Sequence, residues 1–144
     1  MKSLVVEDDF LARALLLTIL SKYGECHVAV NGKEAVRAVE SALEHNQPYD
    51  VMCLDILMPV LDGQKALLEI RKVEKAHGVK DTQGIKVIMV TALEDFENIV
   101  QAFEEGHCEA YLTKPLNREK LLDHLFELEL IERDELTGQQ EVFN

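Results

Sequence analysis

Chemically active side chains follow four of the apolar runs in this sequence. Glu7-Asp8-Asp9 comes directly after LVV, and Asp55 ends the first apolar run in CLDILMPVLDG. Thr91 follows VIMV, and Lys114 stands in YLTKP near the end of the chain. If Glu7, Asp8 and Asp55 meet in one place, their carboxylates repel one another and their pKa values rise. Because Mg²⁺ prefers a few carboxylate oxygens together with waters, such a cluster predicts a magnesium site.

The same groups suit the transfer of a phosphoryl group. Lys114 and a bound cation would neutralise the phosphoryl oxygens, and Thr91 would offer a hydroxyl. Asp55 would attack phosphorus in line and form an acyl phosphate. Because catalysis of this kind depends mainly on positioning and electrostatics, the fold must bring these side chains to one edge. Asp55 is therefore the candidate nucleophile.

Each group taken alone has a simpler structural explanation. Glu7-Asp8-Asp9 is also typical of the acidic first turn of a helix, where the helix dipole favours negative charge. Asp55 stands where an acid often follows a strand, and Asp62-Gly63 indicates a turn without chemistry. Lys114 alone is typical of a solvated surface. The chemical interpretation depends on all these groups standing at strand ends, on the edge where ligands bind in parallel sheets.

Five short apolar runs predict strands, because they are rich in β-branched residues. They cover residues 3–6, 26–30, 51–54, 86–90 and 110–112. Most of them lack alternation, which is typical of a parallel sheet covered on both faces. A segment of helical period follows each run, and these segments cover residues 10–23, 31–43, 64–73, 95–105 and 117–131. The order predicts an α/β fold, a (βα)5 doubly wound sandwich around a five-stranded parallel sheet.

Three segments carry more detailed predictions. In segment 10–23, the stripe predicted to face the sheet contains Leu11, Ala14, Leu15, Thr18 and Ile19. Asn31, with Glu34 three residues later, predicts the start of the second helix. The polar segment 75–84 predicts a long connection at the amino end of the fourth strand, away from the acids.

Composition limits the class of protein. The 144 residues and 47% hydrophobic content predict one domain over residues 1–132, followed by a polar, mobile tail over 133–144. The net charge of −12, from 27 acids against 15 Lys and Arg, argues against binding nucleic acid or an anionic membrane. Cys26, Cys53 and Cys108 lack disulfide or zinc spacing, and no N-terminal segment resembles a signal peptide. We therefore expect a cytoplasmic protein.

Four motifs in this order resemble the receiver domains of two-component response regulators. They are LVVEDD, DVMCLDILMPVLDG, VIMVTA and YLTKP, and the resemblance covers residues 2–131. It implies the flavodoxin-like strand order 2-1-3-4-5, an order taken from the family and its known examples. It also implies a signalling protein that is not an enzyme toward other molecules, since it catalyses only its own phosphorylation and dephosphorylation. The phosphoryl donor would be a histidine kinase or a phosphotransfer protein.

The resemblance implies a role for each site residue. Asp55 would be the phosphoacceptor, and the cofactor would be Mg²⁺ or Mn²⁺. The ligands of that ion would be Asp8, Asp55, the backbone carbonyl of Leu57 and, through water, Glu7. The groups that contact the phosphoryl oxygens would be the side chains of Thr91 and Lys114 and the backbone N–H groups of Leu57 and Ala92. Thr91 and Tyr111 would form the switch pair, and the Lys114–Pro115 bond would be cis.

Two positions influence how long the acyl phosphate survives in this family. They lie two residues after Asp55 and two residues after Thr91, and here they are Leu57 and Leu93. A polar side chain at these positions can orient a water molecule for hydrolysis, whereas leucine cannot. We therefore expect phospho-Asp55 to be comparatively long-lived.

The resemblance favours a stand-alone receiver, similar to chemotaxis regulators, that switches a protein-binding face. That face would be formed by helix 95–105, strand 110–112 and helix 117–131, in a monomer or a phosphorylation-dependent dimer. A phosphorelay intermediate and a phosphate sink are alternatives. A more remote alternative is an aspartyl-nucleophile phosphatase of the haloacid-dehalogenase type, which usually carries a second Asp at the position of Leu57. A flavodoxin-like FMN binder would need a phosphate-binding loop where Glu7-Asp8-Asp9 stands.

Overall fold

A five-stranded parallel sheet forms the centre of the computed structural model, which describes residues 1–132. Its strands are β1 (Ser3–Val6), β2 (Cys26–Ala29), β3 (Val51–Leu54), β4 (Lys86–Thr91) and β5 (Ala110–Thr113). They pair in the order β2-β1-β3-β4-β5, and every neighbouring pair is parallel. The α/β fold and the strand order 2-1-3-4-5 are therefore confirmed. The tail predicted over 133–144 lies outside the described residues.

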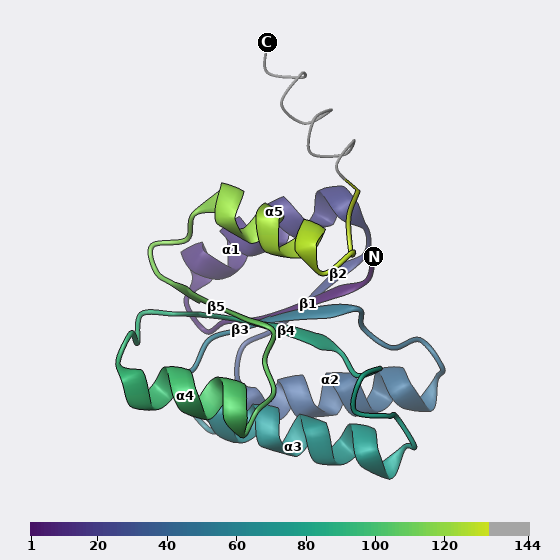
Figure 1. Ribbon diagram of the computed structural model, residues 1–144. Helices are drawn as coiled ribbons and strands as arrows, with labels where there is room; N and C mark the ends of the chain where they lie inside the picture. The colour runs from purple at the N-terminus through teal and green to yellow at the C-terminus, as the bar shows by residue number, and fades with distance from the viewer. Residues whose placement is uncertain (133–144) are drawn as a thin grey trace.

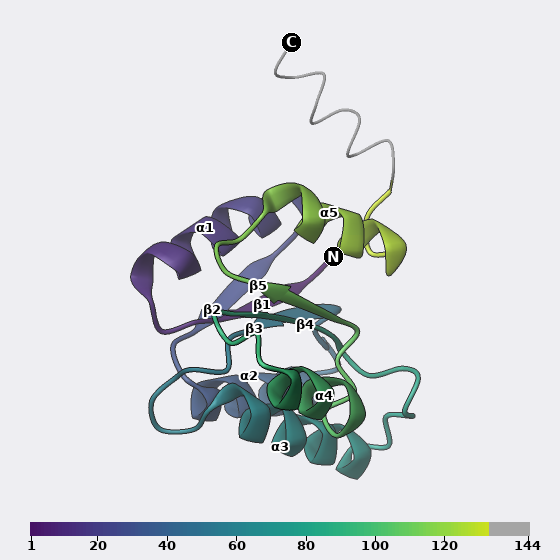
Figure 2. The same ribbon diagram turned by 60° about the vertical axis from the view of Figure 1, so that its left-hand side comes forward.

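Helices cover both faces of the sheet (Figure 1, Figure 2). On one face lie α1 (Phe10–Leu20), which continues into a 3₁₀ turn η1 (Ser21–Tyr23), and α5 (Arg118–Glu127). On the other face lie α2 (Gly32–Glu44), α3 (Gly63–Ala76) and α4 (Phe96–Glu104). Within residues 1–132, no helix is both long and apolar enough to cross a lipid bilayer.

The two layers of helices bury two separate apolar clusters. Alternate residues of the central strands supply them, with Leu4 and Met52 in one cluster and Val5 and Cys53 in the other. Every residue of β1 and β3 is buried. This two-sided burial explains why the sequences of these strands show no polar alternation.

Each α-helix begins with a side chain that accepts a hydrogen bond from a backbone N–H three residues later. These caps are Asp9, Asn31, Asp62, Asp95 and Asn117. The cap predicted at Asn31 is confirmed, and the Glu34 carboxylate accepts a hydrogen bond from the N–H of Val30. Because each helix follows a strand, the capped helix starts lie at the carboxyl edge of the sheet.

The face of α1 that meets the sheet differs from the prediction. Leu16, Ile19 and Leu20 are buried, whereas Leu11 and Leu15 are 75% and 48% exposed. The predicted stripe was right at Ile19 but wrong at Leu11, Leu15 and Thr18, because FLARALLLTIL is apolar around most of the helix and the helical period alone does not select a face. The helix therefore exposes apolar side chains to solvent.

The last helix is shorter than predicted. It ends at Glu127, and the prediction extended it to Ile131. Glu129 adopts a left-handed conformation with φ of 61°, and the N–H of Leu130 donates to the carbonyl of Leu125. This turn returns Ile131 to the apolar cluster, where it is buried. The apolar period continues past the end of the helix, which explains the error.

The connection from α3 to β4 lies at the amino edge of the sheet, as segment 75–84 predicted. The helix extends through Ala76, so the start of the predicted connection is helical. Gly78 then adopts φ of 78°, a conformation that favours glycine. The whole connection lies at the opposite edge from the strand-end acids.

Candidate functional site

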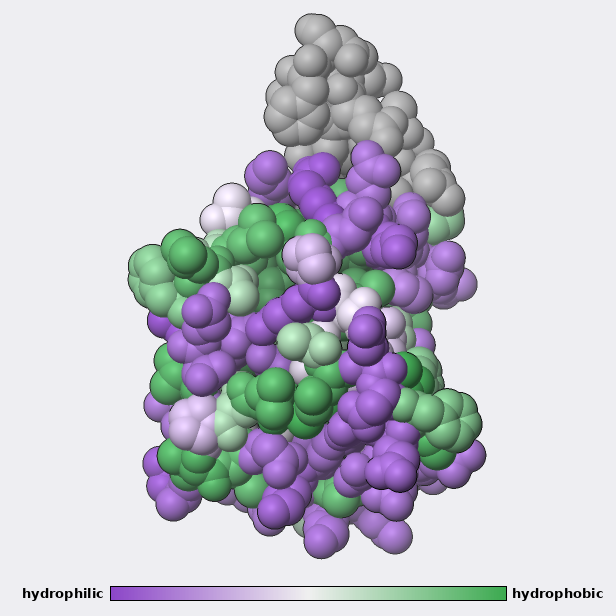
Figure 3. Space-filling model, turned by 90° about the vertical axis from the view of Figure 1, so that its left-hand side faces the viewer, coloured by the Kyte–Doolittle hydropathy of each residue, from purple (hydrophilic) through white to green (hydrophobic). Residues whose placement is uncertain are grey.

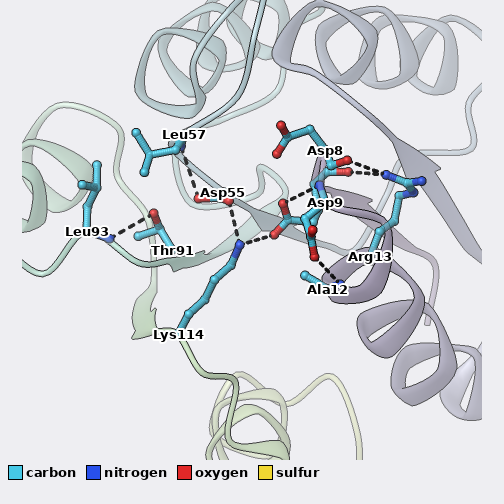
Figure 4. A network of polar contacts seen from close by, with 10 residues as sticks. Asp8, Asp9, Ala12, Arg13, Asp55, Leu57, Thr91, Leu93 and Lys114 are labelled. Carbon is cyan, nitrogen blue, oxygen red and sulfur yellow. Dashed lines mark hydrogen bonds and ion pairs between the residues drawn. The ribbon is translucent and has the colours of Figure 1, made fainter.

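Glu7 and Asp55 meet because β1 and β3 are neighbours in the sheet. Val6 pairs with Leu54 in their register, and the N–H of Asp55 donates to the carbonyl of Val6 at 3.1 Å. Carboxylate oxygens of Glu7, Asp8 and Asp55 all lie within 4.8 Å of one another. The structure therefore brings together the three acids that the sequence placed at strand ends (Figure 4).

The three acids differ in their exposure to solvent. Glu7 is 1% exposed and Asp55 is 4% exposed, whereas Asp8 is exposed. Burial raises the pKa of Glu7, although hydrogen bonds from Lys114 and from the backbone of Asp9 oppose this rise. Two desolvated carboxylates next to an exposed one form a cluster that favours a cation.

Lys114 brings a positive charge to the two buried acids. Its Nζ donates to Glu7 Oε1 at 2.5 Å and to Asp55 Oδ2 at 2.9 Å. Desolvation lowers the pKa of Lys114, but its hydrogen bonds to these two carboxylates outweigh that effect, and the pKa is raised. The side chain is therefore an ammonium group at neutral pH. The Lys114–Pro115 peptide bond is cis, the isomer that the resemblance implies.

The acidic triplet after β1 divides between structure and site. The Asp9 side chain caps α1 by accepting a hydrogen bond from the N–H of Ala12 at 2.9 Å. The N–H of Asp9 donates to Glu7 Oε2 at 3.1 Å, which helps to orient that carboxylate. The structural explanation of the triplet therefore applies to Asp9, while Glu7 and Asp8 remain available to the site.

The loop after β3 holds Asp55 by close backbone contacts. The N–H of Leu57 donates to Asp55 Oδ1 at 3.2 Å, and the N–H of Gly63 donates to the carbonyl of Ile56 at 2.9 Å. A Cβ atom on Gly63 would lie 2.0 Å from the carbonyl oxygen of Asp55, so only glycine permits α3 to begin this close. The turn at Asp62-Gly63, to which the sequence assigned no chemistry, therefore positions the candidate nucleophile.

Thr91 and Tyr111 both contact the backbone of Leu93. The Thr91 side chain is buried at the end of β4, and its Oγ1 accepts a hydrogen bond from the N–H of Leu93 at 3.4 Å. The hydroxyl of Tyr111 donates to the carbonyl of Leu93 at 2.5 Å. Burial raises the pKa of Tyr111 to about 12, so the hydroxyl keeps its proton at neutral pH. The predicted switch pair therefore contacts the first residues of the connection to α4.

Arg13 is a site residue that the motifs did not indicate. Its Nη1 donates to the backbone carbonyls of Glu7 at 3.0 Å and Asp8 at 3.1 Å (Figure 4). It therefore fixes the backbone that carries the two acids. The only signal in the sequence is a basic residue one helical turn after the Asp9 cap, which is too common to identify such a role.

A family comparison covers the same residues. The sequence model of the response regulator receiver domain matches residues 3–126 of this chain. The chain belongs to this family. The match extends from β1 into the last turn of α5, so it includes every residue of the acidic cluster and Lys114.

The sequence of this receiver domain is similar to those of two known proteins. It is 31% identical over 120 residues to the chemotaxis protein CheY of Halobacterium salinarum, which is 83% of this chain and 89% of that protein. It is 33% identical over 125 residues to the histidine kinase CKI1 of Arabidopsis thaliana, which is 80% of this chain but 11% of the kinase. The receiver domain of CKI1, complexed with Mg²⁺ and BeF₃⁻, has a TM-score of 0.75 and 32% identity, with 90% of each chain covered.

The acidic cluster of the receiver domain fits a divalent metal ion. Its donors are carboxylate oxygens from Glu7, Asp8 and Asp55, which are the ligands that Mg²⁺ prefers. One ammonium group, from Lys114, contacts two of these three carboxylates. A divalent cation would compensate the remaining negative charge.

Proposed function

We propose that this receiver domain accepts a phosphoryl group on Asp55 in a Mg²⁺-dependent reaction and thereby switches a protein-binding surface. The environment of Asp55 carries the proposal. Its carboxylate is buried, its Oδ2 lies 2.9 Å from Lys114 Nζ, and Glu7 and Asp8 offer oxygens within 4.8 Å. A relative in the family, the receiver domain of CKI1, is complexed with Mg²⁺ and BeF₃⁻, which supports the same cofactor here.

The proposed reaction is a displacement at phosphorus. A carboxylate oxygen of Asp55 forms a bond to the phosphorus of a phosphohistidine, and the P–N bond breaks. The imidazole leaves with the bonding electron pair and takes up a proton. Lys114, the hydroxyl of Thr91 and the N–H groups of Leu57 and Ala92 would bind the phosphoryl oxygens. Mg²⁺ or Mn²⁺, held by Glu7, Asp8, Asp55 and the carbonyl of Leu57, would neutralise the charge on those oxygens.

We propose that phosphorylation of Asp55 changes the contacts of the Leu93 backbone. A phosphoryl group on Asp55 would attract the Thr91 hydroxyl, which now accepts a hydrogen bond from the N–H of Leu93. Tyr111 holds the carbonyl of the same residue. A change at Thr91 would therefore move the connection that leads to α4. The surface of α4, β5 and α5 would change with it.

We infer that the donor is a histidine kinase or a phosphotransfer protein and that the target is another protein. The support is that relatives of this chain include histidine kinases and a chemotaxis protein. The net charge of −12 disfavours nucleic acid and anionic membranes as partners. The receiver would act in the cytoplasm, as a monomer or a phosphorylation-dependent dimer. It would turn over no substrate beyond its own acyl phosphate.

Intact mass spectrometry tests the proposed function. The protein is incubated with acetyl phosphate and Mg²⁺, and one added phosphoryl group is expected. Asp55→Asn should show no added mass, whereas Asp123→Asn, at an exposed acid on α5, should match the wild type. Hydroxylamine should remove the added group, because an acyl phosphate reacts with it and a phosphoserine does not. Absence of added mass in the folded wild type would contradict the proposal.

A further inference from the structure

Helix α4 exposes an apolar stripe. Phe96 is 79% exposed and Phe103 is 40% exposed, and Val100 lies between them and is partly exposed. These residues stand at i, i+4 and i+7, so they share one face of the helix. Ala102 on the opposite side is fully buried and anchors the helix to the core. The stripe therefore lies on the outer side of a helix that is already packed.

Carboxylates border this stripe, and no basic side chain does so along the same segment. Between Ala92 and Ala110 the sequence contains no Lys or Arg, and its acids are Glu94, Asp95, Glu97, Glu104, Glu105 and Glu109. A hollow of about 460 Å³ on this helix is lined by Phe96, Glu97, Val100, Gln101, Glu104 and Glu105. The same surface therefore carries exposed apolar side chains and carboxylates.

Helix α1 also exposes an apolar face, but a positively charged side chain lies on that face. On α1, Arg13 lies over the ring of Phe10, 5.7 Å from its centroid. Figure 3 views the edge at which the strands end, and green apolar surface appears there in the layer of α1 and in the layer below the sheet. The stripe on α4 therefore differs from the face of α1, because the charged residues along its own segment are all acids.

We propose that α4 is a docking surface for a cationic amphipathic segment of a partner protein. Apolar side chains of the segment would pack on Phe96, Val100 and Phe103, and its Lys or Arg residues would pair with Glu97 and Glu104. A second copy of this chain fits less well, because a symmetric contact through α4 would place the same acids opposite one another. Nucleic acid and anionic lipid would be repelled by the same acids.

Contacts at the start of α4 connect this surface to the phosphoacceptor. Nε2 of Gln64 donates to the carbonyl of Asn98 in the first turn of α4 at 2.8 Å. Gln64 directly follows Gly63, which contacts the backbone at Asp55. Control of the docking surface by phosphorylation of Asp55 rests on the proposed function, whereas the docking surface itself does not.

The experiment measures the binding of a labelled peptide by fluorescence anisotropy. The peptide carries leucines at i, i+4 and i+7 and lysines elsewhere, and a second peptide replaces each lysine with glutamate. The test variants are Phe96→Ser with Phe103→Ser, and Glu97→Gln with Glu104→Gln. The matched controls are Phe10→Ser on α1, and Glu40→Gln with Glu44→Gln at exposed positions of α2.

The lysine peptide is expected to bind the wild type, and the glutamate peptide is not. The Kd should rise on the order of tenfold in the phenylalanine variant of α4 and severalfold in its charge variant. Both controls should keep the wild-type Kd. Absence of binding would overturn the proposal, as would equal weakening by the α2 and α4 charge variants, because net charge alone would then explain the attraction. Self-association that only the α4 phenylalanine variant abolishes, measured by sedimentation, would assign the surface to a second copy instead.

Acetyl phosphate labelling separates this proposal from the proposed function. If the peptide binds at α4 but no phosphoryl group is added, the docking surface stands and the proposed function fails. If the group is added to Asp55 but the peptide does not bind, only the docking surface fails. When both hold, phosphorylation is expected to change the Kd of the peptide, and Asp55→Asn should abolish that change.

Discussion

Two clusters of acids, each built around buried carboxylates, lie at opposite edges of the same sheet, and their partners differ. At the amino edge, Arg71 Nη1 donates to Glu74 Oε1 at 2.9 Å, and Nη2 lies 3.8 Å from Glu109 Oε2. The guanidinium also donates to three backbone carbonyls, those of Ile85, Gly106 and His107. The two carboxylates accept hydrogen bonds from backbone N–H groups, Glu74 from Ile85 and Glu109 from Val87.

Within residues 1–132, the acids at the carboxyl edge are not fully paired with positive charge. Lys114 is the cation that contacts Glu7 and Asp55, and Asp8 adds a third carboxylate to the cluster. A buried charge that is fully paired is typical of a structural role, whereas excess charge of one sign favours protonation or an additional ligand of opposite charge. Burial of acids alone therefore does not mark a functional site. A functional site is indicated when the negative charge of the acids exceeds the positive charge of their partners.

Among these predictions, removal of divalent metal ions should have the largest effect on phosphorylation at the carboxyl edge. In EDTA, acetyl phosphate should add no phosphoryl group to Asp55, and Mg²⁺ should restore the reaction. Mg²⁺ should also raise the Tm of the wild type, because binding to the folded state alone stabilises it. Intact mass and thermal unfolding measure the two effects. Asp8→Asn should reduce both, and Asp123→Asn should reduce neither. Full phosphorylation in EDTA would mean that the carboxyl edge needs no additional cation.

Arg71→Met should damage the stability of the amino edge without removing the chemistry. It leaves the buried carboxylate of Glu74 and the partly buried carboxylate of Glu109 without their guanidinium partner, and we expect a loss of about 3–5 kcal/mol in the free energy of unfolding. Urea unfolding measures this change, and Arg37→Met, at an exposed position on α2, is the control. The folded variant should still accept one phosphoryl group. A loss below about 1 kcal/mol, the range of an exposed pair, would show that this cluster is not a closed structural unit.

Lys114→Met should slow phosphorylation strongly and reduce stability less than Arg71→Met does. It removes the ammonium group that would contact the transferred phosphoryl group, so phosphorylation should slow on the order of a hundredfold. In the presence of Mg²⁺, stability should fall less than in Arg71→Met, because the proposed metal ion would compensate the carboxylates of Glu7 and Asp55. The rate with acetyl phosphate and the urea midpoint measure both effects, with Lys120→Met on α5 as the exposed control. An unchanged rate would remove Lys114 from the proposed reaction.

The sequence predicts the sheet and the site edge because both follow from local signals. The apolar runs of β1 and β3 lack alternation, and their acids come directly after the last strand residue. Once β1 and β3 are neighbours, Glu7 and Asp55 meet without further information. The neighbour relation itself came from the family resemblance. Local pattern therefore predicts which residues stand at the site, and the family supplies the order that joins them.

Contacts between distant segments explain what the sequence does not predict. The buried face of α1 depends on an apolar cluster to which the sheet and α5 also contribute, and FLARALLLTIL offers apolar residues in nearly every direction. Arg71 contacts carbonyls at Ile85, Gly106 and His107, a set that no spacing in the chain indicates. Gly63 is needed only because α3 begins against Asp55. These features arise from tertiary geometry, which the helical period cannot encode.

Leu57→Asn should have the smallest effect, on the lifetime of the acyl phosphate. The N–H of Leu57 already contacts Asp55 Oδ1 (Figure 4), and Leu57 is 55% exposed. An asparagine there could hold a water molecule near phosphorus, so we expect hydrolysis to quicken severalfold, an effect of about 1 kcal/mol on the barrier.

Leu57→Met is the control for that change, because it keeps an apolar side chain and should keep the wild-type decay. After removal of the donor, intact mass against time in Mg²⁺ measures the decay of both variants. Rapid decay in the wild type, or equal decay in Leu57→Asn and Leu57→Met, would show that leucine at this position does not set the lifetime. The excess negative charge of the carboxyl edge would then control when the site reacts, and another group would control how long the product lasts.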